Sequence, residues 1–323
     1  MKSIARPGGS AASESISILC GAKKMRVLSV GGCTLDHIGV VARLFEASVN
    51  QTAEMSKFSV QGGGCAATAV VALARWGVET RFVGKVGDDT RGNVIRMTLA
   101  DEGVDTFEMI RETGAVSQFR FITVENGSGR KRTLFTPGSV SPLTADEVDV
   151  AILNDIDLLM VDGTEKEAQL KLMVEARKRG ITVVYEAKRN QRNVEELVAN
   201  ADVFLASERF ASQFAGVGRL EKLCEVLLER GPSRVIVMMG DEGAVGMERE
   251  SGELIRQPPH EVELVNTTGA GDVFLGATAY GILNDWDFAR ILRFANTAAA
   301  LSCTDIGGRS ALYSVEDIER VAK

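Results

Sequence analysis

Short apolar runs alternate with amphipathic segments along most of the chain. The apolar runs predict strands at 27–30, 81–86, 157–161, 181–185, 203–206 and 234–238. Between them, apolar residues recur every three to four positions, which predicts helices at 66–75, 90–102, 165–179, near 220–227, near 272–283 and at 287–301. Repeated strand–helix units with wholly apolar strands are typical of an α/β fold. We therefore expect a mainly parallel sheet with helices on both faces.

One region breaks this alternation. The segments 118–124 and 132–136 flank Asn126-Gly127-Ser128-Gly129, which is a strong β-hairpin signal. Because no helix separates these two strands, they are expected to be antiparallel. We expect a small β-sheet lid, with strands from about 36–61 and 105–138, on a single domain that spans 25–323. Residues 1–24 are Ser-, Ala- and Gly-rich and are interpreted as a flexible N-terminal extension.

Composition excludes several classes of protein. The chain has 37 basic and 44 acidic residues, and this net negative charge argues against a nucleic-acid partner. No run reaches the roughly 18 apolar residues of a membrane span, so no membrane partner is expected. Five cysteines, an odd number without a C-x-x-C pair, favour free thiols and a cytoplasmic location. With only two histidines, a Ser-His-Asp hydrolase or a His-rich zinc site is disfavoured.

The segment Asn266-Thr267-Thr268-Gly269-Ala270-Gly271-Asp272 leads into a predicted helix. Glycines there let successive backbone N–H groups converge, and the helix dipole adds partial positive charge, so the segment can form an anion hole for a phosphoryl group. Asp272 stands at the rim of this hole, where a carboxylate can accept the proton of an attacking hydroxyl. The alternative is that Asp272 is only the N-cap of the helix after a flexible turn.

Two further glycine-containing segments precede helices. Gly62-Gly63-Gly64 runs into the helix at 66–75 and formally satisfies the dinucleotide pattern G-x-G-x-x-A, but the residues before it make a poor buried strand. The three glycines also suit close backbone approach to a bound sugar, and a simple tight turn is the alternative explanation. The second segment, 84–90, is interpreted alone as a strand–helix turn with acidic N-capping. No P-loop pattern occurs in the chain.

Together and in this order, these three segments resemble the signatures of the PfkB (ribokinase-like) carbohydrate kinase family, over essentially all of residues 25–320. The resemblance implies an α/β core with a β-sheet lid, and transfer of the ATP γ-phosphate to an alcohol with Mg²⁺. Glu186, Ser207 and the C-terminal segment CTDIGGRSAL are most similar to the ketohexokinase and sulfofructose kinase branches.

The resemblance also implies roles for individual residues. Asp272 matches the catalytic base, and Gly269, Ala270 and Gly271 match the anion hole. The sugar side is matched by Asp36, Gly62, Gly63 and Gly64. The nucleotide side is matched by Ser207, Gly240, Gly243, Thr268 and Asn296. Glu186 and Glu208 stand where the metal is held, through water. Each assignment is an expectation that rests on the matching motif.

The chain departs from the family pattern at several of these positions. An asparagine that is usual in the sugar loop is replaced by Gly64 or Cys65, which alters hydroxyl recognition. The usual N-x-x-E segment begins here with Ser207 and Glu208. Asn266 replaces an aspartate that often helps to hold K⁺, so only weak K⁺ activation is expected.

We therefore expect an ATP-dependent kinase that phosphorylates a primary hydroxyl of a ketose or ketose-like sugar, and that forms a homodimer through its lid. One alternative is a nucleoside kinase, whose base pocket would be supplied by Phe119, Phe121 and Phe135. Another is a catalytically silent sugar-binding relative with a regulatory role, which the intact Asp272 and its glycines disfavour. A dehydrogenase is the weakest alternative, because one ambiguous glycine pattern is its sole support.

Overall fold

The computed structural model describes residues 24–44, 52–187 and 194–323. Within these ranges the largest sheet has eight strands, in the order β14 (Leu254–Gln257), β13 (Ala244–Glu248), β12 (Arg234–Met238), β11 (Val203–Ser207), β10 (Thr182–Ala187), β9 (Leu158–Val161), β1 (Arg26–Val30) and β4 (Glu79–Val83). The strands from β12 to β4 are parallel, and β13 and β14 extend the sheet antiparallel at one edge. The predicted mainly parallel sheet is confirmed.

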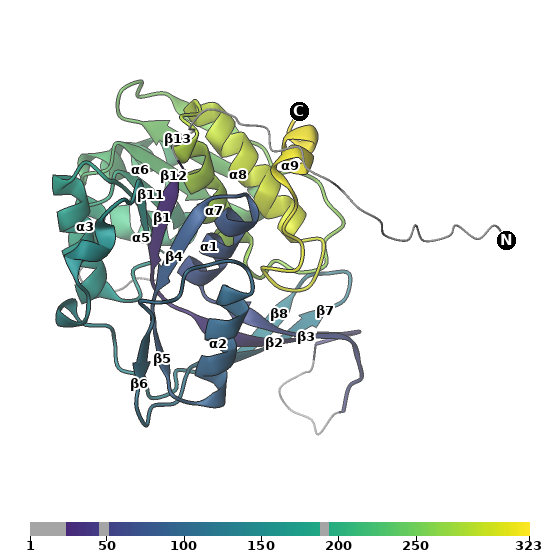
Figure 1. Cartoon of the computed structure of the whole chain (residues 1–323). Coiled ribbons are helices and arrows are strands. Elements are labelled where there is room, and N and C mark those ends of the chain that lie inside the picture. The colour runs from purple at the N-terminus through teal and green to yellow at the C-terminus, as the bar shows by residue number, and fades with distance from the viewer. Residues whose placement is uncertain (1–23, 45–51, 188–193) are drawn as a thin grey trace, which may run out of the picture.

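Helices cover both faces of this sheet (Figure 1). One layer contains α1 (Cys65–Arg75), α7 (Ala270–Leu283), α8 (Phe288–Ser302) and α9 (Val315–Val321). The other contains α3 (Lys166–Lys178), α4 (Val194–Ala199), α5 (Glu208–Ala215) and α6 (Leu220–Glu229). Adjacent strand residues such as Val27 and Leu28 belong to different apolar clusters, one on each face, as period-two alternation requires.

A second sheet projects from the carboxyl end of the large one and forms the lid (Figure 1). Its strands lie in the order β3 (Met55–Gly63), β2 (Thr34–Val41), β7 (Phe119–Glu125) and β8 (Lys131–Thr136). The β7–β8 pair is the predicted antiparallel hairpin, whereas β2 and β7 are parallel. Helix α2 (Thr90–Ala100) begins with Asp89, whose side chain accepts a hydrogen bond from Gly92 N.

The structure differs from the predicted strands in two places. The single strand expected at 81–86 is divided at Gly84 into β4 and β5 (Lys85–Gly87), because Gly84 is in close contact with Gly31 O and the Phe82 ring as the chain leaves the large sheet. β5 then pairs with β6 (Ile110–Glu112) in a separate small sheet. Residues 110–112 are therefore not part of the lid, which begins on that side at Phe119.

Two expectations concern the start of the chain and membrane-spanning helices. Of the expected extension 1–24, only Lys24 is described, and its Nζ donates a hydrogen bond to Glu79 at 2.6 Å. Residues 1–23 lie outside the described ranges. No helix in the described part of the chain combines the length and the apolar character needed to cross a bilayer.

Candidate active site

A cavity of about 440 Å³ lies at the carboxyl ends of the central strands, between the N-terminus of α7 and the lid. Parallel α/β sheets bind ligands at this edge, because the loops that follow the strands meet there. Strands β10, β11 and β12 contribute Glu186, Ser207 and Met238, and the loop after β12 contributes Gly240. The rest of the wall is formed by Asp36, Gly62, Gly63, Thr68, Arg120, Lys131, Thr267, Thr268, Gly269, Gly271, Asp272 and Gly308.

The start of α7, where the sequence predicts an anion hole, lies in the wall of this cavity. Its N-cap is Gly269, which has a φ of 86° and lies so close to Gly308 that a Cβ would be 2.3 Å from the Gly308 Cα. Only glycine fits this position. Because the N-cap is a glycine, no N-cap side chain bonds to the first N–H groups of the helix, and such groups can bind an anion.

Asp272 is the third residue of α7 and not its N-cap, so the alternative explanation of this carboxylate as a helix cap is wrong. Asp272 lies in the cavity wall with its ligand atom within 4.8 Å of those of Glu186 and Cys65. Glu186 lies next to the last residue of β10, is fully buried, and accepts a hydrogen bond from Cys65 Sγ at 2.9 Å. The carboxylates of Glu186 and Asp272 are hard oxygen donors, which is the donor type that Mg²⁺ prefers.

Glu208, the second expected metal ligand, is not brought to this cluster. Ser207 is the N-cap of α5 and its Oγ accepts from Phe210 N, and this geometry turns the next residue outward. Glu208 is exposed and is not part of the cavity wall. Among the expected metal ligands in the described ranges, only Glu186 fits.

The lid presents Asp36 at the opposite side of the cavity. Asp36 is 4% exposed, and Thr34 Oγ1 donates a hydrogen bond to its Oδ1 at 3.0 Å. Burial raises the pKa of the Asp36 carboxyl, although Arg120 and Thr34 partly offset this effect. Gly63 lies directly against it, since a Cβ there would be 2.2 Å from Asp36 Oδ2. The glycine loop thus leaves room for a buried carboxylate that can accept hydrogen bonds from substrate hydroxyls.

Sequence analysis missed Asp162, a buried residue that connects the segment after β1 to the start of α1. Asp162 follows β9, is 4% exposed, and accepts hydrogen bonds from Gly32 N at 3.0 Å and Ala66 N at 3.2 Å. It therefore ties the crossing from β1 into the lid to the first turn of α1. Its other oxygen accepts from Thr164 and Gln169. An aspartate directly after an apolar strand was the available signal.

Only some of the residues expected to contact the nucleotide line the cavity. Ser207, Gly240 and Thr268 line the cavity, whereas Gly243 and Asn296 do not. Asn296 is buried in α8, and its Nδ2 donates to Pro258 O at 2.8 Å. On the sugar side, Gly64 is the N-cap of α1 with a φ of 98° and is not part of the cavity wall. Ala270, expected in the anion hole, is the first residue of α7 and is not part of the wall either.

Two lid cations were also missed. Arg120 lies directly across from Asp36 in the β2–β7 register, and its guanidinium is 5.8 Å from the Phe135 ring centroid. Lys131 begins β8, and its Nζ donates to Thr268 Oγ1 at 3.3 Å, next to the anion hole. The hairpin was predicted, but which of its side chains face the cavity depends on the register of β2 with β7.

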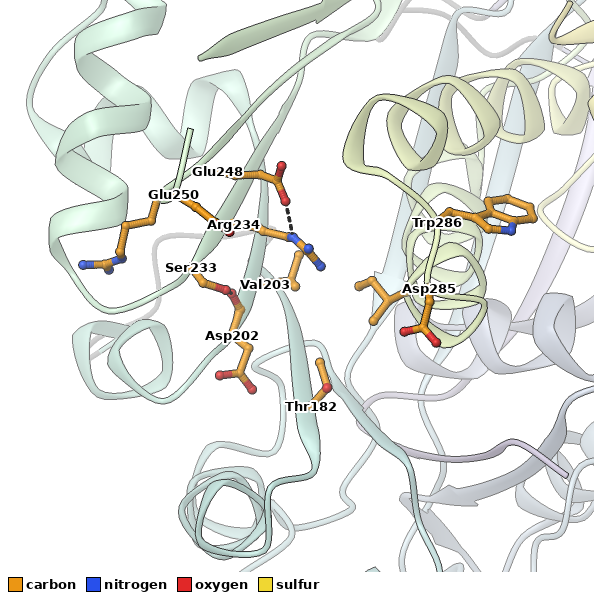
Figure 2. Close-up of a pocket in the computed structure, with 11 residues that line it drawn as sticks. Thr182, Asp202, Val203, Ser233, Arg234, Glu248, Glu250, Asp285 and Trp286 are labelled. Atoms are coloured by element: carbon orange, nitrogen blue, oxygen red, sulfur yellow. Dashed lines mark hydrogen bonds and ion pairs between the residues drawn. The ribbon is translucent and has the colours of Figure 1, made fainter. Parts of the chain in front are cut away.

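A second hollow, of about 630 Å³, lies at the amino ends of β10, β11 and β12 (Figure 2). Arg234 and Glu248 form an ion pair at 2.6 Å within it, and Trp286 and Asp285 stand on its far side (Figure 2). Among the described residues that line it, there is no glycine-rich turn and no helix N-terminus of the kind found in the first cavity. The catalytic candidate is therefore the cavity at the carboxyl ends.

Comparison with known proteins agrees with this geometry. Residues 24–314 match the family described as pfkB family carbohydrate kinase. A ribokinase of Haemophilus influenzae is 25% identical over 88% of this chain and 94% of its own, and an ATP-dependent ribose-1-phosphate kinase of Halopiger xanaduensis is 29% identical over 89% and 95%. The solved structure of a putative ribokinase from Agrobacterium tumefaciens superposes with a TM-score of 0.85 at 25% identity, over 93% of this chain and 97% of its own. The chain belongs to the pfkB family of carbohydrate kinases.

Proposed function

We propose that the protein transfers the γ-phosphate of ATP to a primary hydroxyl of a ketose or ketose-like sugar, with Asp272 as the general base. The observation that carries this proposal is the shared cavity. Asp272 and the uncapped N-terminus of α7 form one part of its wall, and the buried Asp36 of the lid forms another.

Each part of the wall has a task in this reaction. Asp36 accepts hydrogen bonds from sugar hydroxyls and sets the orientation of the acceptor. Asp272 accepts the proton of the attacking hydroxyl as the new P–O bond forms. The first N–H groups of α7 stabilise the negative charge on the transferring phosphoryl group, since they are fixed before the reaction and lie at a helix N-terminus.

ATP and Mg²⁺ enter the proposal from the family and from the donor set. A relative at 29% identity is named as ATP-dependent, and the structure of a putative ribokinase II from Escherichia coli was solved with ATP and Mg²⁺. Glu186 would hold the magnesium ion through water, and the bound ion would neutralise charge on the phosphates. Ser207, Gly240 and Thr268 would contact the nucleotide.

The ketose assignment is supported by Glu186, Ser207 and the C-terminal segment, and a fructokinase of Zea mays is 26% identical over 90% of this chain and 96% of its own. The nucleoside alternative loses support. Strand alternation places Phe119 and Phe121 on the lid face opposite Arg120. Phe135 lies on the same face as Arg120, but no aromatic side chain of the described residues lines the cavity. The expected cytoplasmic location stays a prediction from cysteine usage.

The test is a coupled ADP-release assay with Mg·ATP across ketoses, aldoses, sugar acids, sugar phosphates and nucleosides. We expect a ketose or ketose-like sugar to give the highest kcat/KM, and mass spectrometry or NMR of the product to place the phosphate on a primary carbon. A preferred nucleoside, or a phosphate on a secondary hydroxyl, would contradict the proposal. The Asp272→Asn protein is the control for contaminating kinases.

A further inference from the structure

Three side chains with different metal-ligand chemistry meet in the active site. Cys65 Sγ, a carboxylate oxygen of Glu186 and a carboxylate oxygen of Asp272 all lie within 4.8 Å of one another. The closest pair is already in contact, because Cys65 Sγ donates to Glu186 Oε2 at 2.9 Å. The cysteine is partly buried, and Glu186 is fully buried.

The fold holds these three groups together from separate elements. Cys65 is the first residue of α1, Asp272 is the third residue of α7, and Glu186 lies near the end of β10. Helices α1 and α7 pack so closely that a Cβ on Gly276 would be 2.7 Å from Ala69 O. Two helix N-termini therefore converge on the cluster, and both favour negative charge on its ligands.

This donor set differs from the one that magnesium needs. Mg²⁺ takes oxygen ligands, which Glu186, water and the phosphates supply, whereas a thiolate selects a softer ion such as Zn²⁺. In a tetrahedral zinc site, with Zn–S near 2.3 Å and Zn–O near 2.1 Å, ligand atoms are about 3.5 Å apart. Atoms already within 4.8 Å reach that spacing by small side-chain rotations.

We propose that Cys65, Glu186 and Asp272 form a three-ligand Zn²⁺ site that switches the kinase off. Zn²⁺ binds the Cys65 sulfur as a thiolate, and the proton now donated to Glu186 passes to solvent. Both carboxylates bind as anions, no electron is transferred, and water completes the tetrahedron. With its carboxylate engaged by the metal, Asp272 cannot accept the proton of an acceptor hydroxyl. The inhibitory part of this inference rests on the proposed function, whereas the binding part does not.

Binding is tested without nucleotide, using Co²⁺ as the spectroscopic probe of the zinc site in the full-length protein. All proteins carry Cys20→Ser, which removes the one thiol outside the described residues. We expect a saturable sulfur-to-cobalt charge-transfer band that Zn²⁺ displaces, that is lost in Cys65→Ser, and that persists in Cys303→Ser. Cys303 is a matched control, since its Sγ donates to Ala299 O in the last turn of α8 and a serine hydroxyl can replace it. A band retained in Cys65→Ser, or absent in the parent, overturns the site.

Inhibition is tested in zinc-buffered assays with excess Mg·ATP, each protein being compared with its own zinc-free rate. We expect the inhibitory Zn²⁺ concentration to rise at least about 10-fold in Cys65→Ser, since loss of even an outer-shell partner weakens metal sites by that much. If Cys65→Ser does not fold, alkylation of Cys65 in the parent decides: Zn²⁺ must slow it, and an unchanged rate overturns the proposal. If the protein phosphorylates a sugar and Zn²⁺ does not slow this reaction, the inhibitory site is wrong but the proposed function stands.

If the cobalt band appears but no sugar is phosphorylated, the proposed function is wrong but the metal site stands.

Discussion

A single substitution distinguishes a catalytic role of Asp272 from a purely structural one. Because Gly269, not Asp272, is the N-cap of α7, Asp272→Asn removes no helix cap. We expect kcat to fall at least ~10²-fold, the typical contribution of a general base, while the melting temperature changes little.

Asp287→Asn is the matched control for that substitution. Asp287 is the N-cap of α8, where its side chain accepts from Arg290 N at 2.9 Å, and asparagine caps as well as aspartate. Turnover and melting temperature should both stay at the parent values. An Asp272→Asn protein that keeps more than a tenth of the parent kcat would exclude Asp272 as the base.

Asp36 predicts how sugar affinity depends on pH. Burial raises the pKa of its carboxyl, so it takes up a proton at a higher pH than an ordinary aspartate does. The ionised carboxylate accepts stronger hydrogen bonds from sugar hydroxyls than the neutral acid does, so KM for the sugar should rise as pH falls through that raised pKa. The same shift makes the folded state bind this proton more tightly than the unfolded state, so the contribution of Asp36 to stability decreases as pH rises from the ordinary to the raised pKa.

The measurement is KM for the sugar against pH at saturating Mg·ATP. In Asp36→Asn the KM should be higher throughout and lose this acid dependence, because the amide does not titrate. A parent KM that stays flat down to the pH where an ordinary aspartate is protonated would contradict the assignment.

Asn266 predicts weak dependence on K⁺. The side chain is fully buried, and its Oδ1 accepts from Thr268 N, which shapes the approach to the anion hole without adding a negative charge. An amide carbonyl offers a cation only a dipole. Titrating KCl against a tetramethylammonium background should therefore change turnover little, and Asn266→Asp should increase the response. Strong, saturable activation of the parent by K⁺ would refute this prediction.

At the residue scale, the sequence located the groups that lie in glycine-rich motifs and missed those that depend on register. Asp272 and Gly63 could be found because glycines on a helix approach have a limited set of explanations. Arg120 could not, since its place across from Asp36 follows from the non-local parallel pairing of β2 with β7. Glu208 was misjudged because capping by Ser207 decides which way the first turn of α5 faces.

Among the elements, the crossing from β1 to the lid depends on one buried carboxylate. Asp162→Asn replaces one acceptor oxygen of Asp162 with an NH₂ group, so that some of its N–H donors lose their partner. Hydrogen bonds to charged groups contribute about 1.5–3 kcal/mol each, so we expect a loss of about 2–3 kcal/mol in the free energy of unfolding. Denaturant unfolding measures this loss of free energy.

The control for loss of charge alone is Asp149→Asn. Asp149 is an exposed helix cap whose side chain accepts a hydrogen bond from Ala151 N. Equal losses in Asp162→Asn and Asp149→Asn would show that burial at Asp162 is unimportant.

The elements that sequence predicted best are those whose pattern is local. Buried parallel strands such as β9 and β12 are short apolar runs, and helices such as α3 end where a glycine takes a positive φ, as Gly180 does at 71°. The division at Gly84 and the pairing of β5 with β6 could not be predicted, because they follow from contacts with Gly31 and Phe82 made only in the folded chain. The antiparallel strands β13 and β14 were not predicted, because β13 is a five-residue segment interrupted by Gly246 and β14, at the edge of the sheet, is only four residues long and partly exposed.

At the scale of the whole molecule, the outer face of the lid carries exposed apolar side chains. Val60, His37, Phe121 and Leu134 lie in one cross-strand row on the face opposite Asp36 and Arg120. Leu134 is 71% exposed, and Val60 is 46% exposed. A small sheet that carries apolar side chains on both faces exposes a surface that a second copy can cover. We therefore predict a homodimer in which two lids pack face to face.

Leu134→Asp tests this assembly, because it places a charge where the partner lid would exclude water. Burying a leucine contributes about 1.5–3 kcal/mol, and an unpaired buried carboxylate costs more, so the substitution should shift a dimer to monomer at micromolar concentration. Phe107→Asp is the control, since Phe107 is 84% exposed but lies outside the lid strands. Light scattering coupled to gel filtration should give a dimeric mass for the parent and for Phe107→Asp, and a monomeric mass for Leu134→Asp. A monomeric parent, or a Leu134→Asp dimer of unchanged affinity, would mean that the lids do not form the interface.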